Sequence, residues 1–557
     1  MSAKSYRTAA IALAASACCT GALAAPSEEA RSLNELRNTV VNLLQGLVEK
    51  GVLTRDQAQA MVETAQKKAA DDAAAADAAT AAQEKADAGA VRVPYVPEIV
   101  REQIRKEIMA ELGPQVTKDV VEQAKSEQWG VPGALPEWVQ RVRWYGDVRV
   151  RGQGDMFADE NLPNSYLDVL TVNDRGGIGR AQLAALANTT EDRQRLRARL
   201  RVGLEAELGY GWSLGARLTT GTLRDAVSTN QTLGTYAGRY TTGFDLGYLK
   251  WYHNSATGRH VVNAWGGRIP NPWLSTDLVW DPDLTFEGVA ANYRFGLMRD
   301  DPYSHYAFLT LGAFPLQEVE LSTKDKWLYG GQLGFEWKFT GGSRLRFGAA
   351  YYQYDNIKGV DNILDGNLND FTAPQWVQKG NSLIDIRNDA DTSTQLLALA
   401  ADYHIANATL NFDYRVSPGY RVALSADYAK NIGFKDEDVL ALNAKCLTVF
   451  CYRIAHTDKA RTNGYETELN FGSVQMDHGG AWRTYFGYRY VEADAVLDAF
   501  TDSDFHLGGT DAKGFFVGGD FAFSSHVFAR LKYFSANEID GPPLGIDLWQ
   551  LDINASF

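Results

Sequence analysis

The sequence contains no long hydrophobic run. None of its uninterrupted apolar stretches approaches the roughly 20 residues that a membrane-spanning helix requires. The mean hydropathy of −0.28 agrees with this, and together the two observations exclude a helical-bundle membrane protein. They do not exclude a membrane barrel, because barrel strands alternate apolar and polar residues and average to mild hydrophilicity.

Basic charge is also scarce. The chain has 55 Lys and Arg residues against 69 Asp and Glu residues, a formal net charge of −14. Nucleic-acid-binding proteins need clustered basic residues to neutralise phosphates, so we exclude nucleic acid as a partner.

Motifs of enzymes are missing as well. The eight histidines are scattered, and the chain has no metal-ligand spacing, no GxSxG motif and no phosphate-binding loop. We therefore expect no enzyme activity, no cofactor and no metal. A barrel enzyme stays open as an alternative, because its site would come from rim residues far apart in the sequence.

The N-terminal segment 1–24 has the features of a secretory signal peptide. Lys4 and Arg7 supply the positive charge, residues 9–17 supply the apolar stretch, and residues 22–24 supply the small-residue cleavage site. Loss of the two basic residues takes the formal net charge from −14 to −16.

Only two of the four cysteines remain after this cleavage. They are Cys446 and Cys451, in a stretch that we place on the outer rim. In an oxidising compartment a small loop-closing disulfide is the expected state, rather than a free or a metal-binding pair.

The C-terminal segment 546–557 alternates strictly by twos. One face carries Trp549, Leu551, Ile553, Ala555 and Phe557. The other face carries Leu548, Gln550, Asp552, Asn554 and Ser556. Such a strand with lipid on one side and water on the other fits the last strand of an outer-membrane barrel, which pairs with the first strand to close it. The 26 Tyr, 24 Phe and 13 Trp suit aromatic girdles at two membrane interfaces, although a large β-rich soluble protein would also contain many of them.

Residues 25–142 follow a different, helical pattern. An a/d spacing runs through Leu33, Leu36, Val40, Leu43 and Leu47. Residues 68–90 form an Ala-rich linker without apolar anchors, and residues 98–127 are helical again. We expect a periplasmic helical region with a coiled coil that oligomerises subunits. Amphipathic packing onto the base of the barrel is the alternative.

From residue 143 to 557 the period is two, which predicts an all-β transmembrane barrel of antiparallel strands. Clear strands are expected at 144–151, 193–208, 211–220, 243–252, 260–269, 284–295, 305–314, 327–340, 343–354, 420–430, 463–472, 480–491, 513–524, 526–535 and 546–557. Residues 394–416 hold either one strand or two. Bacterial barrels have an even strand count with short periplasmic turns, so we count 394–416 once and predict sixteen strands, with eighteen as the alternative.

Three segments give the chain a resemblance to the bacterial putative porin family. They are Val48-Glu-Lys-Gly-Val-Leu-Thr54, Trp129-Gly-Val-Pro-Gly-Ala-Leu-Pro-Glu-Trp138 followed by Tyr145-Gly-Asp-Val-Arg-Val-Arg151, and Asn271-Pro-Trp-Leu-Ser-Thr-Asp-Leu-Val-Trp-Asp-Pro-Asp283. Together with Phe557 they cover essentially the whole mature chain. The resemblance implies an outer-membrane barrel with a periplasmic N-terminal region. The architecture is also similar to that of phosphate-selective porins, but no segment carries their selectivity residues over.

The densest polar pattern is an arginine ladder in residues 193–207. Arg195, Arg197, Arg199 and Arg201 share one face, and the opposite face is apolar. Because an arginine at the bilayer midplane costs about 2–4 kcal/mol, the arginines must face the lumen. Arg149 and Arg151 on the preceding strand and Arg217 on the next are expected to flank them. Such a ladder suits stepwise passage of anions, unless Glu205, Glu207 and other acidic neighbours neutralise it.

The segment 270–283 would be the third outer loop, the loop that forms the constriction of trimeric porins. We assign to this constriction Asp277, Asp281, Asp283, Glu287, Trp273 and Trp280. An acidic loop opposite the arginine ladder would create a transverse field across the narrowest point. An ordinary solvated loop is the alternative.

These patterns favour an outer-membrane porin of a Gram-negative bacterium, a passive channel for small polar solutes with a possible anion preference. Its expected partners are outer-membrane lipids, polar or anionic solutes, two further copies in a homotrimer, and the cell wall or periplasm through the N-terminal helices. A structural barrel that tethers the envelope through those helices is the second hypothesis.

Overall fold

The computed structural model describes residues 141–320, 322–391, 393–437, 439 and 460–557. The predicted signal peptide, almost all of the predicted helical region and the pair Cys446 and Cys451 lie outside these residues. Among the residues described, no helix is both long and apolar enough to cross a membrane.

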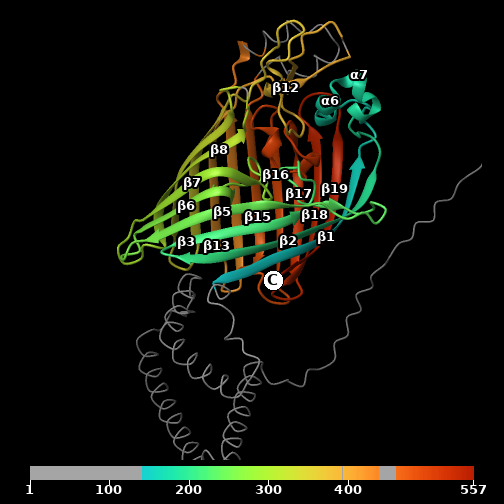
Figure 1. Ribbon diagram of the computed structural model, residues 1–557. Helices are drawn as coiled ribbons and strands as arrows, with labels where there is room; N and C mark the ends of the chain where they lie inside the picture. Colours follow the sequence, from blue (N-terminus) through green and yellow to red (C-terminus); the bar gives the residue numbers. More distant parts are fainter. Residues whose placement is uncertain (1–140, 321, 392, 438, 440–459) are drawn as a thin grey trace, which may run out of the picture. The chain divides into compact units, whose positions relative to one another are not determined.

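Most strands of the described chain form one antiparallel sheet that closes on itself (Figure 1). The strands of its wall, in chain order, are β1 (Val142–Phe157), β2 (Arg193–Gly209), β3 (Trp212–Thr220), β5 (Thr242–Asn254), β6 (His260–Pro270), β7 (Thr285–Gly296), β8 (His305–Gln317), β9 (Lys326–Lys338), β10 (Arg344–Asp355), β13 (His404–Arg415), β14 (Tyr420–Asn431), β15 (Asn463–Ser473), β16 (Trp482–Val491), β17 (Ala512–Ala522), β18 (Val527–Glu538) and β19 (Gly545–Ser556). A seventeenth member, β4 (Gln231–Thr232), is a two-residue segment beside β2. Sixteen strands therefore span the wall, which confirms the predicted number.

The barrel closes where β19 pairs with β1, from Asp147 opposite Ser556 to Phe157 opposite Ile546. The alternation predicted for this last strand is confirmed. Leu551 and Phe557 are 48% and 66% exposed on the outer face, whereas Asp552 on the inner face is 1% exposed. Side chains of a strand point alternately to opposite faces, so the same rule separates an apolar exterior from a polar interior around the ring.

The connections between strands alternate in length. Short turns join β2 to β3, β5 to β6, and β17 to β18 at the end where β1 begins and β19 finishes, the turn end. Long connections lie at the opposite end, the loop end, which also carries α6 (Val169–Arg175) and α7 (Ile178–Ala181) (Figure 1). The small elements η2 (Gln182–Ala185), η3 (Asp370–Thr372), η5 (Asp498–Phe500) and η6 (Phe505–Leu507) lie in these long connections.

The prediction of one strand over residues 394–416 was wrong. The wall strand β13 begins only at His404, and β12 (Leu397–Leu399) pairs with β11 (Leu383–Asp385) in a separate two-stranded sheet. The physical reason is that residues 397–401 are buried on both faces, so this segment belongs to the interior rather than to an amphipathic wall.

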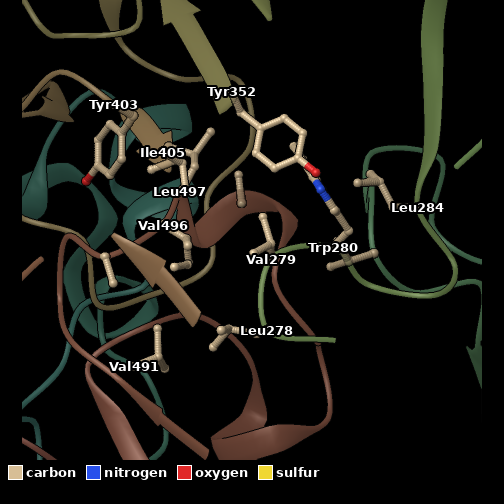
Figure 2. Close-up of a cluster of buried hydrophobic side chains, with 14 of the residues drawn as sticks. Leu278, Val279, Trp280, Leu284, Tyr352, Tyr403, Ile405, Val491, Val496 and Leu497 are labelled. Atoms are coloured by element: carbon tan, nitrogen blue, oxygen red, sulfur yellow. The ribbon is translucent and has the colours of Figure 1, made fainter. Parts of the chain in front are cut away.

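Three long connections fold back into the loop end and bury a hydrophobic cluster there. Figure 2 shows Leu278, Val279 and Trp280 of the connection 271–284 against Val496 and Leu497 of the connection 492–511. Tyr403 comes from the connection 356–403, and Tyr352, Ile405 and Val491 come from the wall. The loop end of the barrel is thus packed by apolar side chains of these connections.

Candidate functional site

The pairing of β1 with β2 brings the predicted arginines together on the inner face. Arg149 lies directly opposite Arg199, and Arg151 lies opposite Arg197. Leu196, between two of these arginines in the sequence, is 60% exposed on the outer face. The structure therefore places the arginine side chains in the lumen, as the lipid cost of an outward arginine requires. We call Arg149, Arg151, Arg195, Arg197, Arg199, Arg201 and Arg217 the arginine face.

Two carboxylates bind Arg199 and Arg201 of this face. The Asp147 carboxylate lies 2.7 Å from Nη2 of Arg199 and 2.7 Å from Nε of Arg201. Asp283 lies 3.1 Å from Arg199 and 3.2 Å from Arg201. Charge-assisted pairs of this kind hold the guanidinium planes in fixed orientations.

Three other members of the arginine face pair with further aspartates. Arg151 pairs with Asp552 at 2.7 Å and with Asp504 at 2.9 Å. Arg195 pairs with Asp155 at 2.5 Å, and Arg217 pairs with Asp245 at 2.8 Å.

Of the counter-charges that the sequence suggested, Asp283 is found on the arginine face, whereas Glu205 and Glu207 form no pair with it in the described part of the chain. Glu205 is bound 2.6 Å from Arg143, outside the arginine face, and no ion pair of Glu207 occurs among the described residues. The acidic partners are aspartates from the neighbouring strands and from the connections 271–284 and 492–511.

Arg197 differs from the other members of the face. Its Nη1 donates to Oε1 of Gln153 at 3.3 Å and its Nη2 donates to Oγ of Ser228 at 3.3 Å, and both acceptors are neutral. Within the described part of the chain, no carboxylate oxygen comes within 4.0 Å of this guanidinium, and its buried Nε has no hydrogen-bond partner. Arg149, the remaining member, has its nearest carboxylate, Asp283, at 3.9 Å. Among the described residues, Arg197 is thus the member of the face without a carboxylate within 4.0 Å.

The predicted constriction loop lies inside the barrel. We call residues 271–284 the crossing loop. Near its start, Leu274 exchanges two 2.8 Å hydrogen bonds with Gln332 of β9. Thr276 donates its hydroxyl to Asp427 of β14 at 2.8 Å, and Asp283 near its end reaches the arginines of β2. These contacts carry the loop from one wall of the lumen to the other.

Trp273 and Trp280 anchor the crossing loop by edge-to-face packing. The ring centroid of Tyr352 on β10 lies 5.2 Å from that of Trp273. It lies 5.0 Å from that of Trp280, and Figure 2 shows these two side chains. Gly330 of β9 makes room for this arrangement, because a Cβ there would lie 2.6 Å from the indole of Trp273. Aromatic pairs of this geometry add about 0.5–1.5 kcal/mol each beyond the burial of their area.

The three aspartates of the crossing loop have different environments. Burial raises the pKa of Asp277 to about 6, and the nearby Asp502 adds to the shift. Burial also raises the pKa of Asp281 well above its ordinary value, although backbone amides of Asp283 and Ser503 donate to its carboxylate. Burial would raise the pKa of Asp283 too, but the neighbouring arginines lower it overall. Asp283 is therefore the firmly ionised member.

Asp277 borders a cavity of about 380 Å³ beneath the crossing loop. Glu466 and Glu468 of β15 line it together with Arg344, Arg346 and Arg421. A second cavity of about 480 Å³ lies at the loop end and is lined by Arg193, Arg195 and Arg197. The crossing loop thus has the arginine face at one end and a mixed, carboxylate-bearing surface at the other.

Glu287 does not belong to this constriction. Phe286 and Ala290 of β7 are buried inside the barrel, so Glu287 has the opposite parity and shares the outer face with Val289, which is 57% exposed. Its carboxylate lies 2.9 Å from Arg268 on the neighbouring strand. The sequence assignment of Glu287 to the constriction was wrong because the strand alternation begins before it.

Sequence reasoning missed the connection 492–511, which we call the inner loop. Its Asp504 binds Arg151, and its Asp502 lies 3.0 Å from Arg489. The backbone oxygen of Phe500 accepts from the amide of Asp281 at 2.8 Å, which joins the inner loop to the crossing loop. The length of this connection was a usable signal, since loops longer than about 12–15 residues are uncommon unless they have a function.

A closed antiparallel barrel with an apolar exterior and a charged interior defines an outer-membrane β-barrel protein. The model of the family described as "Putative porin" matches residues 37–557, and the chain belongs to this family. No curated protein sequence matches the chain.

Solved porin structures are similar to the chain at low sequence identity. OprB of Pseudomonas putida, in its high-pH structure, is 12% identical, with a TM-score of 0.41 and coverage of 76% of this chain and 96% of that one. A loop-deletion mutant of OmpT from Vibrio cholerae is 10% identical, with a TM-score of 0.38 and coverage of 75% and 99%. OmpF of Salmonella typhi, in complex with daunomycin, is 10% identical, with a TM-score of 0.38 and coverage of 75% and 97%.

Proposed function

We propose that this outer-membrane channel protein lets small polar solutes diffuse passively and favours anions. The observation that carries the proposal is Arg197, an inward arginine whose guanidinium has only neutral hydrogen-bond partners among the described residues. The remaining arginines are paired with carboxylates, so they supply fixed donors more than net charge. A passing anion would therefore be attracted most strongly at Arg197. It would then bind in turn to the donors of the paired arginines.

The crossing loop supports a second part of the proposal, a transverse field at the narrowest point. Asp283 is held against the arginine face. Asp277 borders the cavity beneath the crossing loop, together with Glu466 and Glu468. A zwitterionic or polar solute would orient between positive groups on one wall and carboxylates on the other. Arg489, which binds Glu466, weakens this field without removing it. Arg344, Arg346 and Arg421, which line the same cavity, weaken it further.

The decisive experiment measures the reversal potential of the full-length protein in planar bilayers across a potassium chloride gradient. We expect an anion-leaning channel, and we expect Arg197→Glu to move the reversal potential toward that of a cation-selective channel. Arg299→Glu is the matched control, because this exposed arginine in the turn after β7 lies at the turn end of the barrel. Absence of conductance, or a reversal potential that Arg197→Glu leaves unchanged, refutes the proposal.

We further infer that the turn end faces the periplasm, because bacterial barrels place their short turns there. β1 begins at this end, so residues 25–142 would also be periplasmic, and a homotrimer held partly by a coiled coil remains our expectation. Light scattering of the detergent-purified protein tests the trimer. Deletion of residues 25–128 tests the tether hypothesis, which predicts envelope detachment with unchanged conductance.

A further inference from the structure

The loop-end cavity of about 480 Å³ has two contrasting sides. Its basic side consists of Arg193, Arg195 and Arg197 along β2. Its apolar side includes Leu170 of α6, Trp376 and Leu507. The volume lies in the range of about 300–1,000 Å³ that small-molecule sites occupy.

The basic side has donors that no described residue uses. The Nε atoms of Arg195 and Arg197 are buried and have no hydrogen-bond partner. The bonds that Arg197 makes through Nη1 and Nη2 are both 3.3 Å long, so they are weak and can be exchanged. An unpaired buried donor costs free energy, and a charge-assisted acceptor would recover it.

The neighbouring carboxylates do not fill this place. Asp155 is committed to Arg195, and Asp504 is committed to Arg151. Asp225, which also lines the cavity, accepts hydrogen bonds from the backbone amides of Val227 and Ser228 instead. Arg193 is solvent-exposed and has no ion pair among the described residues either. Arg197 is therefore the partly buried guanidinium whose charge is left for a ligand.

We propose that the loop-end cavity binds small monocarboxylates with an apolar body, the carboxylate on Arg197 and the body against Leu170, Trp376 and Leu507. The inference rests on the proposed function and names the class of solute that the channel admits. A planar carboxylate can accept from Nε and one Nη of the same guanidinium. A single partly buried arginine without a carboxylate partner suits a monoanion better than a phosphate dianion. The apolar side would gain nothing from a compact inorganic ion.

Benzoate is the probe, and calorimetric titration of the detergent-folded full chain is the first readout. We expect saturable binding of benzoate, much weaker binding of acetate and inorganic phosphate, and none of benzylamine. In planar bilayers, benzoate should reduce the chloride current over the same concentration range. The titration does not depend on conductance, so failure of the channel proposal and failure of this proposal are distinguishable.

Two variants and one control locate the site. Arg197→Gln should weaken benzoate binding about tenfold or more, the loss expected for one charge-assisted pair. Leu170→Trp should weaken it by filling the apolar side while Arg197 stays in place. Arg299→Gln makes the same charge change at the exposed turn after β7 and should bind as the unaltered protein does. Equal binding by Arg197→Gln and the control, or tighter binding of phosphate than of benzoate, overturns the proposal.

Discussion

The two walls of the lumen hold the crossing loop by different interactions. On the side of β9 and β10 the loop is held by shape, through Trp273 and Trp280 against Tyr352. On the side of β2 it is held by charge, through Asp283 against Arg199 and Arg201. The aromatic contacts present no charge to a solute, whereas the ion pairs place charged groups beside the lumen. The aromatic wall therefore fixes where the loop lies, and the ionic wall decides what charge a solute meets.

Removal of the aromatic anchor should give the largest effect. Trp280→Ala should destabilise the loop by about 3–5 kcal/mol, because Trp280 is 1% exposed and its loss leaves a cavity. The barrel wall keeps its own hydrogen bonds, so we expect a folded channel with higher and noisier single-channel conductance. Trp144→Ala is the control, since this side chain is 62% exposed on the outer face. Unchanged conductance of Trp280→Ala would mean that the crossing loop does not narrow the lumen.

Removal of the ionic anchor should change selectivity more than stability. Asp283→Asn leaves Arg199 and Arg201 with Asp147 as their only carboxylate among the described residues. We expect a loss of about 1–3 kcal/mol in the free energy of unfolding, because one charged acceptor of buried donors disappears. The reversal potential in a salt gradient should move further toward the value of a channel that is permeable only to anions. A shift toward cations would contradict the assignment of the ionic wall.

The stability of the inner loop, which packs against the crossing loop, should depend on pH. Burial raises the pKa of Asp498 to about 7, and its Oδ1 has no hydrogen-bond partner in the described part of the chain. A folded-state pKa above the ordinary value means that the folded loop binds a proton more tightly than the unfolded one. Its stability should therefore be greatest at acid pH and fall as the pH rises toward about 7.

Hydrogen exchange measures this effect on the amides of residues 492–511. Their protection factors, corrected for intrinsic rates, should fall about tenfold or more between mildly acid and mildly alkaline pH. Asp498→Asn should flatten the pH dependence, whereas Asp365→Asn in an exposed loop should leave it as it is. A pH dependence that persists in Asp498→Asn would assign it to another carboxylate, such as Asp281.

The smallest effect is expected at Glu287. Glu287→Gln breaks an exposed pair with Arg268 on the outer face and should cost less than about 1 kcal/mol. Conductance and reversal potential should stay those of the unaltered channel. Altered ion selectivity would return Glu287 to the constriction and contradict its outer position.

The wall was predictable from the sequence because one physical rule governs all of it. Alternation placed Arg195 to Arg201 inside and Leu196 outside, and parity gave the strand count. The same rule fails for segments buried on both faces, such as residues 397–401. For this reason the predicted strand 394–416 began before the true start of β13 at His404. Thr276 and Asp427, which are in contact, are separated by 151 positions in the sequence. Arg151 and Asp504 are separated by 353 positions. Such partners follow from the path of the loops through the lumen, which local periodicity does not encode.

The crossing loop also has a mechanical consequence. It is bound to β2 through Asp283 and to β14 through Thr276, and eight strands separate these two on one side of the ring and six on the other. A ring of strands alone could flatten into an ellipse with little change in its hydrogen bonds. A chain segment stretched across the ring acts as a brace, and flattening would have to break its contacts at both walls. Lateral pressure from the lipid would then change the cross-section little, and the size limit for a solute would stay constant as the bilayer changes.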